Sequence, residues 1–192
     1  MILSLTGPSG VGKTTLMHNL LKALPNVKPL VSYTTRAARP SDEPGEYKYV
    51  SQEEFDRMQA AGEFLWTANA YVNHYGTRKV DIDEALESKD ALYMPVLVLS
   101  AVKKLHEYAN EVGKIANLHS MYIHIEDENE LRSRFKERGD KPAEAEARIQ
   151  ECRSWNIDAK NLGVPFIYLE AQKKREDILA DALAHIHAAG IE

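Results

Sequence analysis

The sequence predicts an α/β fold in which helices cover both faces of a mainly parallel sheet. Short apolar runs alternate with helical patterns along the 192 residues, which is typical of stacked βα units. A glycine-rich phosphate-binding motif directly follows the first apolar run and directly precedes the first helical pattern. With 44% hydrophobic residues, the chain is also long enough to bury a core without covalent cross-links.

The expected core elements follow one another in regular order. Strands are predicted where the apolar runs are short, and helices where apolar residues recur every three or four positions. The predicted strands cover residues 2–6, 31–34, 91–99, 121–125 and 166–169, and the predicted helices cover 14–24, 101–111, 128–137, 143–161 and 173–188. Pro25 ends the first helix, and Pro95 weakens the third strand because proline cannot donate a ladder hydrogen bond.

Residues from about 36 to 88 interrupt this order. An alternating segment is found at 47–50, Ser51-Gln52-Glu53-Glu54 matches the capping box that starts a helix, and a short helix is predicted at 82–86. We interpret the segment as a small α+β insertion, since roughly 50 residues bury little core alone. A single domain is therefore expected over 1–192, with a core of residues 1–35 and 89–192.

The charge balance restricts the kinds of ligand. The chain has 24 Lys and Arg against 29 Asp and Glu, a net charge of -5 and a pI near 5.8. Such a protein lacks the broad positive field that binds nucleic acid or anionic membranes, so neither is an expected partner. The single cysteine, Cys152, cannot form an internal disulfide, and no apolar run approaches the roughly 20 residues that span a bilayer. We therefore expect a cytoplasmic protein.

Residues 7–14, Gly-Pro-Ser-Gly-Val-Gly-Lys-Thr, match the P-loop pattern G-x-x-x-x-G-K-[ST]. Glycines in such a loop let backbone N–H groups point at phosphate oxygens, helped by the N-terminus of the following helix. Lys13 would contact the β- and γ-phosphates, and Thr14 would bind Mg²⁺. The residues predicted to bind ATP are Gly7, Pro8, Ser9, Gly10, Val11, Gly12, Lys13, Thr14 and Thr15. Binding of ATP or GTP is thus the first functional prediction.

A P-loop alone leaves several classes of protein open. The guanine-selecting N-K-x-D motif of common GTPases is missing, and the chain is short for an ATPase motor. What remains is a compact enzyme that needs a second anion site. Arg36 and Arg39, which follow a predicted strand, are the candidates for that site. Guanidinium forks suit a phosphate that must be gripped during transfer, although a solvated basic loop is the alternative. The hydroxyls of Tyr47, Tyr75 and Thr77 can hold phosphate without changing the charge balance.

Taken together, these segments resemble the guanylate kinase family. The motifs are GPSGVGKT, SYTTRAARP, GEYKYVSQEEF, AGEF, HYGT and RFKERG, in that family's order over almost the whole chain. The resemblance implies a three-layer P-loop kinase fold with an acceptor-binding insertion and a short lid at about 138–147. It also implies a nucleoside monophosphate kinase that uses Mg²⁺ and moves the γ-phosphate of ATP onto GMP or dGMP.

The resemblance further implies roles for individual residues. Ser32, Arg36, Arg39, Tyr47 and Tyr75 fall where the family binds the acceptor phosphate, and Thr77 falls where it helps to bind the base. Arg134, Arg138 and Arg148 fall where lid and hinge arginines clamp the phosphates, so they and Lys13 are the expected catalytic residues. Arg134 and Arg138 lie i, i+4 on one helical face and can project toward one point. A surface ion-pair ladder with neighbouring glutamates is the alternative.

Two departures from the family pattern concern the base of the acceptor. The family carries a glutamate in E-F-x-E-W-A that reads the guanine edge, and this chain has Trp66 in that place. The family carries D-x-D at the end of the central strand, where this chain has Val96-Leu97-Val98-Leu99-Ser100, without a carboxylate. Trp66 is therefore expected either to bind the substrate by stacking on a base or sugar, or to fill the core.

The identity of the acceptor is consequently left open. GMP, dGMP or another nucleotide is the first candidate, and another phosphorylated small molecule such as ribose 1,5-bisphosphate is the second. A non-catalytic guanylate-kinase-like binding module is a further alternative, although Lys13 and Thr14 are intact. Small-molecule nucleotides are the expected partners, and a monomer or homodimer is the expected state.

Overall fold

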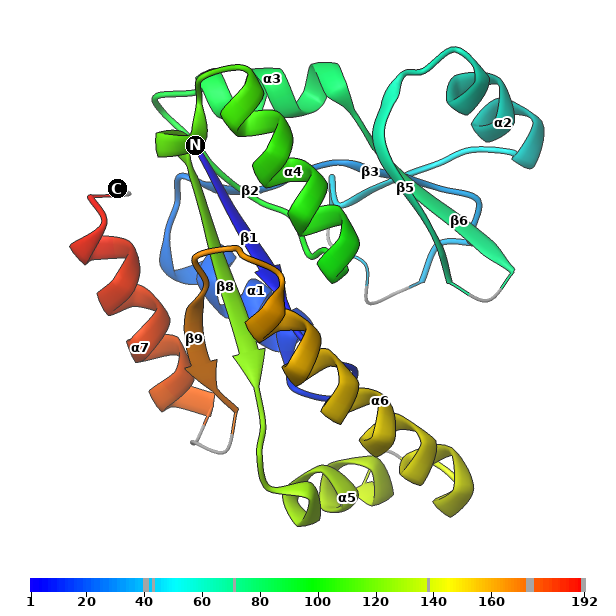
Figure 1. Ribbon diagram of the computed structural model, residues 1–192, viewed down its shortest axis with the longest axis vertical. Coiled ribbons are helices and arrows are strands. Elements are labelled where there is room, and N and C mark those ends of the chain that lie inside the picture. The colour runs from blue at the N-terminus through cyan, green and yellow to red at the C-terminus, as the bar shows by residue number, and fades with distance from the viewer. Residues whose placement is uncertain (40–41, 43, 71, 138, 172–174, 191–192) are drawn as a thin grey trace.

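The computed structural model describes residues 1–39, 42, 44–70, 72–137, 139–171 and 175–190 (Figure 1). Its larger sheet has five parallel strands in the order β2-β7-β1-β8-β9. These strands are β1 (Ile2–Thr6), β2 (Val27–Pro29), β7 (Leu92–Met94), β8 (Leu118–His124) and β9 (Ile167–Glu170). The mainly parallel sheet predicted from the sequence is thus confirmed.

Helices cover both faces of this sheet (Figure 1). They are α1 (Lys13–Ala23) and α7 (Arg175–Ala188), which pack against each other on one face, and α4 (Leu99–Glu111) and α6 (Pro142–Asn161) on the other. The three layers agree with the predicted α/β class. Within the described part of the chain, every helix is too short or too polar to cross a membrane.

Strand β1 divides the core between the two faces, because alternate residues of a strand point to opposite sides. Leu3 and Leu5 pack with residues of α1 and α7 in one cluster, and Ile2 packs with residues of α4 in another. Ser4, which comes between these two leucines in the sequence, is fully buried, and its hydroxyl contacts that of Ser120 on β8. The central strand therefore gives the loop that follows it a rigid support.

The smaller sheet has four strands in the order β4-β3-β6-β5 and forms the insertion predicted from the sequence. Its elements are β3 (Ser32–Thr34), β4 (Tyr47–Tyr49), β5 (Phe64–Ala70), β6 (Asn73–Arg78) and the helix α2 (Gln52–Ala60). Phe55 of α2 stacks on Phe64 of β5 with 4.7 Å between ring centroids. This separate buried cluster gives the insertion its own small core.

The predicted capping box starts α2 as expected. Ser51 Oγ accepts a hydrogen bond of 3.2 Å from the backbone N–H of Glu54. The carboxylate of Glu54 bonds the guanidinium of Arg57 one turn later. The serine hydroxyl therefore caps the helix, and the glutamate forms an ion pair on its surface.

The remaining helices are α3 (Lys79–Glu87), the 3-10 helix η1 (Ile115–Asn117) and α5 (Glu128–Glu137). Helix α5 and the first turns of α6 project away from the larger sheet (Figure 1). The lid predicted at about 138–147 falls at the junction between these two helices. Arg138 lies outside the described residues.

The predicted strand at 31–34 is present as β3, but it belongs to the smaller sheet. The edge of the larger sheet is instead β2, which pairs with β7. The sequence does not predict β2, because Lys28 and Pro29 leave only one buried apolar side chain in it. A short edge strand therefore needs few apolar residues when the neighbouring strand supplies its hydrogen-bond partners.

The predicted strand over 91–99 is shorter than expected, since β7 covers only 92–94. The carbonyl of Pro95 still accepts a hydrogen bond of 2.9 Å from Leu5 N, and helix α4 already begins at Leu99. Proline has no N–H to donate and therefore ends the strand. Residues 95–98 therefore form an irregular segment between β7 and α4.

A buried polar chain lies between the larger sheet and α4. Ser4 Oγ and Ser120 Oγ are 2.6 Å apart, and His106 Nε2 lies 2.8 Å from Ser120 Oγ. Burial lowers the pKa of His106 from its ordinary 6.5, and nearby His119 adds to this effect. The fold therefore favours the neutral imidazole.

We expect acid to weaken the fold through His106. Because its folded-state pKa is below the unfolded value, the stabilisation is fully present above about pH 6.5 and is lost as the pH falls through the folded pKa. Urea unfolding of wild type between pH 7 and pH 5 should show this loss, and His106→Gln should show a shallower pH dependence. The exposed His185→Gln variant is the control. Equal pH slopes for wild type and His106→Gln contradict the prediction.

Candidate functional site

The P-loop lies between the end of β1 and the start of α1, and glycines shape it. Gly10 and Gly12 have φ values of 87° and 101°, which side chains rarely adopt. A Cβ on Gly7 would lie 2.4 Å from the carbonyl oxygen of Ile123, and a Cβ on Gly10 would lie 2.6 Å from the ring of Phe135. The loop is thus held between the sheet on one side and α5 on the other.

Lys13 is folded back over this loop. Its Nζ donates hydrogen bonds to the carbonyl oxygens of Gly7 at 2.7 Å and Pro8 at 2.8 Å. Burial lowers the pKa of Lys13 to about 8, although Glu151 and Cys152 act in the opposite direction. The ammonium group is therefore already at the loop, and a phosphate group there would favour its charged form.

The other P-loop side chains are either buried in the core or exposed at the surface. Val11 is buried in the core cluster, and Thr14 and Thr15 are exposed on the first turn of α1. The Thr14 hydroxyl is accessible to a cation held by nucleotide phosphates, so the loop fits a nucleotide with Mg²⁺. Among the residues that the structure describes, no group of three or more His, Cys, Asp or Glu side chains is placed to hold a metal ion.

Arg36, just after β3, is the centre of a polar and aromatic cluster beside the smaller sheet. Its guanidinium donates to the carbonyl oxygen of Ala37 at 2.8 Å and to Asp42 Oδ1 at 2.9 Å. It also lies 4.9 Å from the centre of the Tyr47 ring, and Tyr47 meets Tyr75 edge to face at 6.2 Å. Arg36 is only 7% exposed, so burial, a carboxylate and an aromatic ring all define its position.

Two of the predicted hydroxyl groups meet beside this cluster. Ser32 Oγ and Thr77 Oγ1 are 3.3 Å apart, and Thr77 is fully buried. Ser32 pairs with Tyr47 in the parallel ladder between β3 and β4. The structure thus brings most of the predicted acceptor residues together, while the side chain of Arg39 is exposed at the edge.

Trp66 does not reach the surface of the smaller sheet. It is 5% exposed and packs in a core cluster that includes Leu30 and Leu97. A bulge between Phe64 and Trp66 places these two residues in different clusters, although they are two positions apart on one strand. The packing role expected as the alternative is therefore observed, and stacking on a ligand stays a prediction.

The predicted lid and hinge arginines differ in their contacts. Arg148 donates from Nη1 to Ser9 Oγ at 3.1 Å, and its guanidinium lies 5.8 Å from the centre of the Phe135 ring. Arg134 bonds Glu130 at 2.9 Å and the carbonyl oxygen of Ala171. Arg148 therefore reaches the P-loop directly. The Glu130–Arg134 ion pair belongs to the set of surface ion pairs that the sequence allows as the alternative role.

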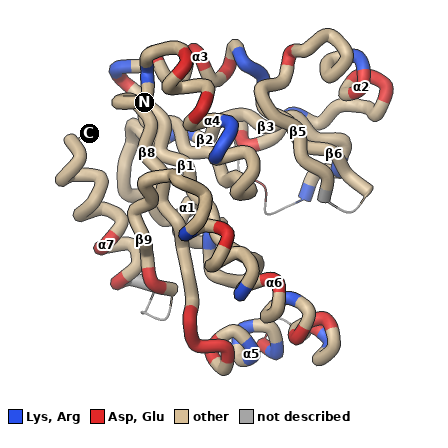
Figure 2. The backbone as a smooth tube through the Cα atoms, viewed as in Figure 1, with Lys and Arg blue, Asp and Glu red and all other residues tan. Residues whose placement is uncertain are grey.

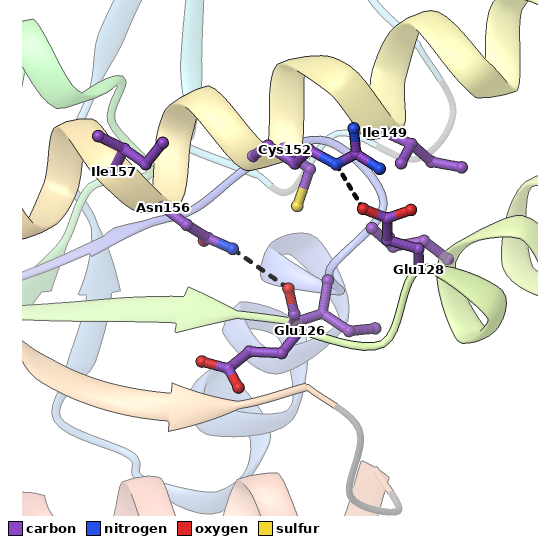
Figure 3. Close-up of a pocket in the computed structure, with 9 residues that line it drawn as sticks. Glu126, Glu128, Ile149, Cys152, Asn156 and Ile157 are labelled. Atoms are coloured by element: carbon purple, nitrogen blue, oxygen red, sulfur yellow. Dashed lines mark hydrogen bonds and ion pairs between the residues drawn. The ribbon is translucent and has the colours of Figure 1, made fainter.

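A pocket between the segment that leads from β8 into α5 and the middle of α6 was not predicted from the sequence (Figure 3). Its lining residues are Ile125, Glu126, Glu128, Leu131, Ile149, Cys152, Arg153, Asn156 and Ile157. The Asn156 amide donates to the Ile125 carbonyl at 3.2 Å and accepts from the Tyr122 hydroxyl at 2.9 Å. Burial raises the pKa of Cys152 to about 11, which keeps its thiol neutral and unreactive.

Ion pairs connect the two helices around this pocket. Glu128 of α5 pairs with Arg153 of α6, and Arg132 of α5 pairs with both Glu128 and Glu146. Figure 2 shows basic and acidic residues mixed along α5 and α6. Helices α5 and α6 are therefore tied together by side chains of opposite charge, in addition to their apolar contacts.

A family model, described as guanylate kinase, matches residues 1–160. The chain belongs to the guanylate kinase family. It is 33% identical to a guanylate kinase of Symbiobacterium thermophilum over 190 residues, which is 98% of this chain and 83% of that protein. It is 30% identical to a guanylate kinase of Rhodopseudomonas palustris (strain HaA2) over 184 residues, or 91% of this chain and 81% of that one.

Solved structures agree with membership of the guanylate kinase family at the level of the fold. A guanylate kinase from Anaplasma phagocytophilum aligns with a TM-score of 0.69 and 24% identity, covering 100% of this chain and 85% of that one. A gluconokinase from Sinorhizobium meliloti aligns with a TM-score of 0.51 and 17% identity, covering 97% of this chain and 91% of that one. The family consists of P-loop nucleoside monophosphate kinases, and the P-loop and insertion described above are present in this member.

The contact between Gly10 and Phe135 leads to a test of P-loop packing. Gly10→Ala should destabilise the fold by about 1–3 kcal/mol, as overpacking does, because its Cβ would overlap the Phe135 ring. Gly12→Ala is the matched control, since it also has positive φ but no atom lies within 4 Å of its Cβ. Chemical unfolding should show a greater loss for Gly10→Ala than for Gly12→Ala.

The partner variant Phe135→Leu tests the cause of that loss. It opens space beside Gly10, so the double variant Gly10→Ala/Phe135→Leu should lose less stability than the sum of the two single losses. Strict additivity would mean that backbone strain at Gly10, and not the Phe135 ring, sets the cost.

Proposed function

We propose that this protein is an ATP-dependent phosphotransferase that moves the γ-phosphate of ATP onto the phosphate of a nucleoside monophosphate. The observation that carries the proposal is that cationic side chains lie in two separate groups, each suited by its chemistry to a phosphate. The P-loop with Lys13 and Arg148 is the first, and the cluster of Arg36, Tyr47 and Tyr75 in the smaller sheet is the second. Membership of the guanylate kinase family supports this assignment.

The proposed reaction needs positioning more than a nucleophilic side chain. A phosphate oxygen of the acceptor attacks the γ-phosphorus of ATP, the bond to the β-phosphate oxygen breaks, and ADP leaves with the electron pair. Lys13 and the loop amides hold the donor phosphates, and Arg148 beside Ser9 adds positive charge to the same loop. Arg36 orients the acceptor phosphate. Bound Mg²⁺, with Thr14 as its protein ligand, would neutralise phosphate charge.

The lid role that we propose for Arg134, as for Arg138 outside the described residues, requires that Arg134 change its partners. Arg134 would leave Glu130 and the Ala171 carbonyl to contact a bound phosphate. Closure of the α5–α6 junction over the two nucleotides would also exclude water and limit hydrolysis of ATP.

GMP and dGMP are the first acceptors we propose, because the curated relatives are guanylate kinases. A second candidate is a phosphorylated acceptor without a guanine base, such as ribose 1,5-bisphosphate. The observation in its favour is that Trp66 packs with Leu97, so apolar side chains fill positions where the family resemblance implies carboxylates. The intact Lys13 and its contacts favour an enzyme over a binding module.

ADP release from ATP and Mg²⁺ decides among these acceptors. The panel contains GMP, dGMP, AMP, UMP, dCMP, dTMP and ribose 1,5-bisphosphate, and we expect turnover with GMP and dGMP. Turnover with ribose 1,5-bisphosphate alone would support the second candidate. ATP binding without turnover on any acceptor would overturn the proposed activity in favour of a binding module.

Two substitutions should separate the donor site from the acceptor site. Lys13→Ala should lower kcat by about 100-fold or more, because it removes a charge that stabilises the transferred phosphate. Arg36→Ala should mainly raise the acceptor KM, by about 10-fold or more, since a charge-assisted hydrogen bond is lost. Steady-state kinetics measure both. Arg57→Ala, in an exposed ion pair on α2, is the control, and full activity of Lys13→Ala would refute the donor-site assignment.

The lowered pKa of Lys13 predicts a pH profile. The side chain is charged below its pKa of about 8, so kcat/KM for ATP should fall as the pH rises through 8. Bound phosphates favour the charged amine, so kcat at saturating ATP should hold to a higher pH. Initial rates between pH 6 and pH 10 test this, and identical pH profiles for kcat and kcat/KM would contradict it.

A further inference from the structure

We propose that Asp42 is a positioning residue for the acceptor phosphate, and that it acts by fixing the guanidinium of Arg36. The inference rests on the proposed function, because it concerns how that acceptor site is built. Asp42 belongs to the polar loop between β3 and β4, and the sequence motifs give this residue no role. Its side chain is 13% exposed, which is unusually low for a loop carboxylate.

The carboxylate of Asp42 gathers three donors from different parts of the loop. Oδ1 accepts from Arg36 Nη2 at 2.9 Å. Oδ2 accepts from the backbone N–H of Arg39 at 2.7 Å and from the hydroxyl of Tyr49 at 2.6 Å. One side chain thus joins the second residue after β3, the middle of the loop and the end of β4.

These contacts fix the plane of the Arg36 guanidinium. Asp42 holds one nitrogen, the carbonyl of Ala37 holds another, and the face of the group lies over the Tyr47 ring. A planar group with two edge contacts and one face contact has little rotational freedom left. Guanidinium has five N–H donors. In the described part of the chain Arg36 contacts Ala37, Asp42 and Tyr75, which leaves N–H donors for a phosphate.

The charge of Asp42 is part of its role. Burial acts to raise the pKa of Asp42, but the hydrogen bonds from Arg36, Tyr49 and the Arg39 amide outweigh it and hold that pKa at about 2. The carboxylate is therefore ionised throughout the range of an enzyme assay. It compensates a guanidinium that is only 7% exposed and would be costly to bury alone.

A competing interpretation is that Asp42 occupies the place of the acceptor phosphate and must be expelled. The contacts favour positioning, because Asp42 would have to leave the Arg39 amide and the Tyr49 hydroxyl as well as Arg36. Both of these donors belong to the framework of its own loop. The two interpretations predict opposite changes in acceptor affinity.

Asp42→Asn keeps the size of the side chain and removes its charge. We expect the acceptor KM, measured with GMP or with the acceptor that the panel identifies, to rise by about 10-fold. The KM for ATP should stay within about twofold of wild type, since the P-loop is untouched. Asp42→Glu should recover part of the loss, and Tyr49→Phe should raise the acceptor KM by about two- to threefold, because only one of the three donors is removed. Asp81→Asn, which disrupts an ion pair with Arg78 in the same part of the fold, is the control.

A double variant tests whether Asp42 acts through Arg36. Asp42→Asn/Arg36→Ala should be no worse for the acceptor KM than Arg36→Ala alone. Thermal melting of each variant checks folding, and Tyr49→Phe keeps the proposal testable if Asp42→Asn does not fold.

The outcomes separate the possibilities. A lower acceptor KM in Asp42→Asn would establish the competing carboxylate and overturn the positioning role. An unchanged acceptor KM in folded Asp42→Asn, or independent effects of the two substitutions, would also overturn it while leaving the proposed function intact. A wild-type protein that phosphorylates no acceptor would overturn the proposed function and this inference together.

Discussion

The site depends on the tight packing of the P-loop between the larger sheet and α5. Gly7 lies against the carbonyl of Ile123, and Gly10 lies against the ring of Phe135, so neither position has room for a side chain. The same ring lies under the guanidinium of Arg148, which contacts Ser9 in the loop. One aromatic side chain thus supports the phosphate-binding backbone and an arginine that serves it. The shape of the loop at Gly10 and the position of Arg148 therefore both depend on Phe135.

Contacts with nearby groups also hold the positive charges of the candidate site. The chain has a net charge of -5, and the cations of the candidate site are held by local partners. Lys13 is held by two carbonyl oxygens, Arg36 by Asp42, and Arg134 by Glu130. Each of these cations is therefore oriented by an acceptor from its own stretch of the chain. An acidic protein can in this way offer two small phosphate sites without a broad positive surface.

Local signals in the sequence predict the fold better than they predict the site. The P-loop, the short apolar run of β1 and the Ser51 cap are local features, and the structure contains all three. The sheet to which β3 belongs, and the bulge that buries Trp66, depend on pairing with distant strands. The contact of Arg148 with Ser9 joins residues 139 positions apart, and no spacing rule reveals it. Asp42 carries no motif, because its importance comes from three donors that only the folded loop brings together.

The strand order has a consequence for how the protein is made. Strand β1 precedes the other strands of the larger sheet in the sequence, but its neighbours are β7 and β8, and its Ser4 meets Ser120 across 116 positions. Contacts between residues so far apart form slowly, because the entropy of a long loop is lost before the strand contacts stabilise the pairing. Strand β1 must therefore wait for β8, which begins at Leu118, before its pairing is complete. The P-loop attached to β1 is made long before the strand that completes its support.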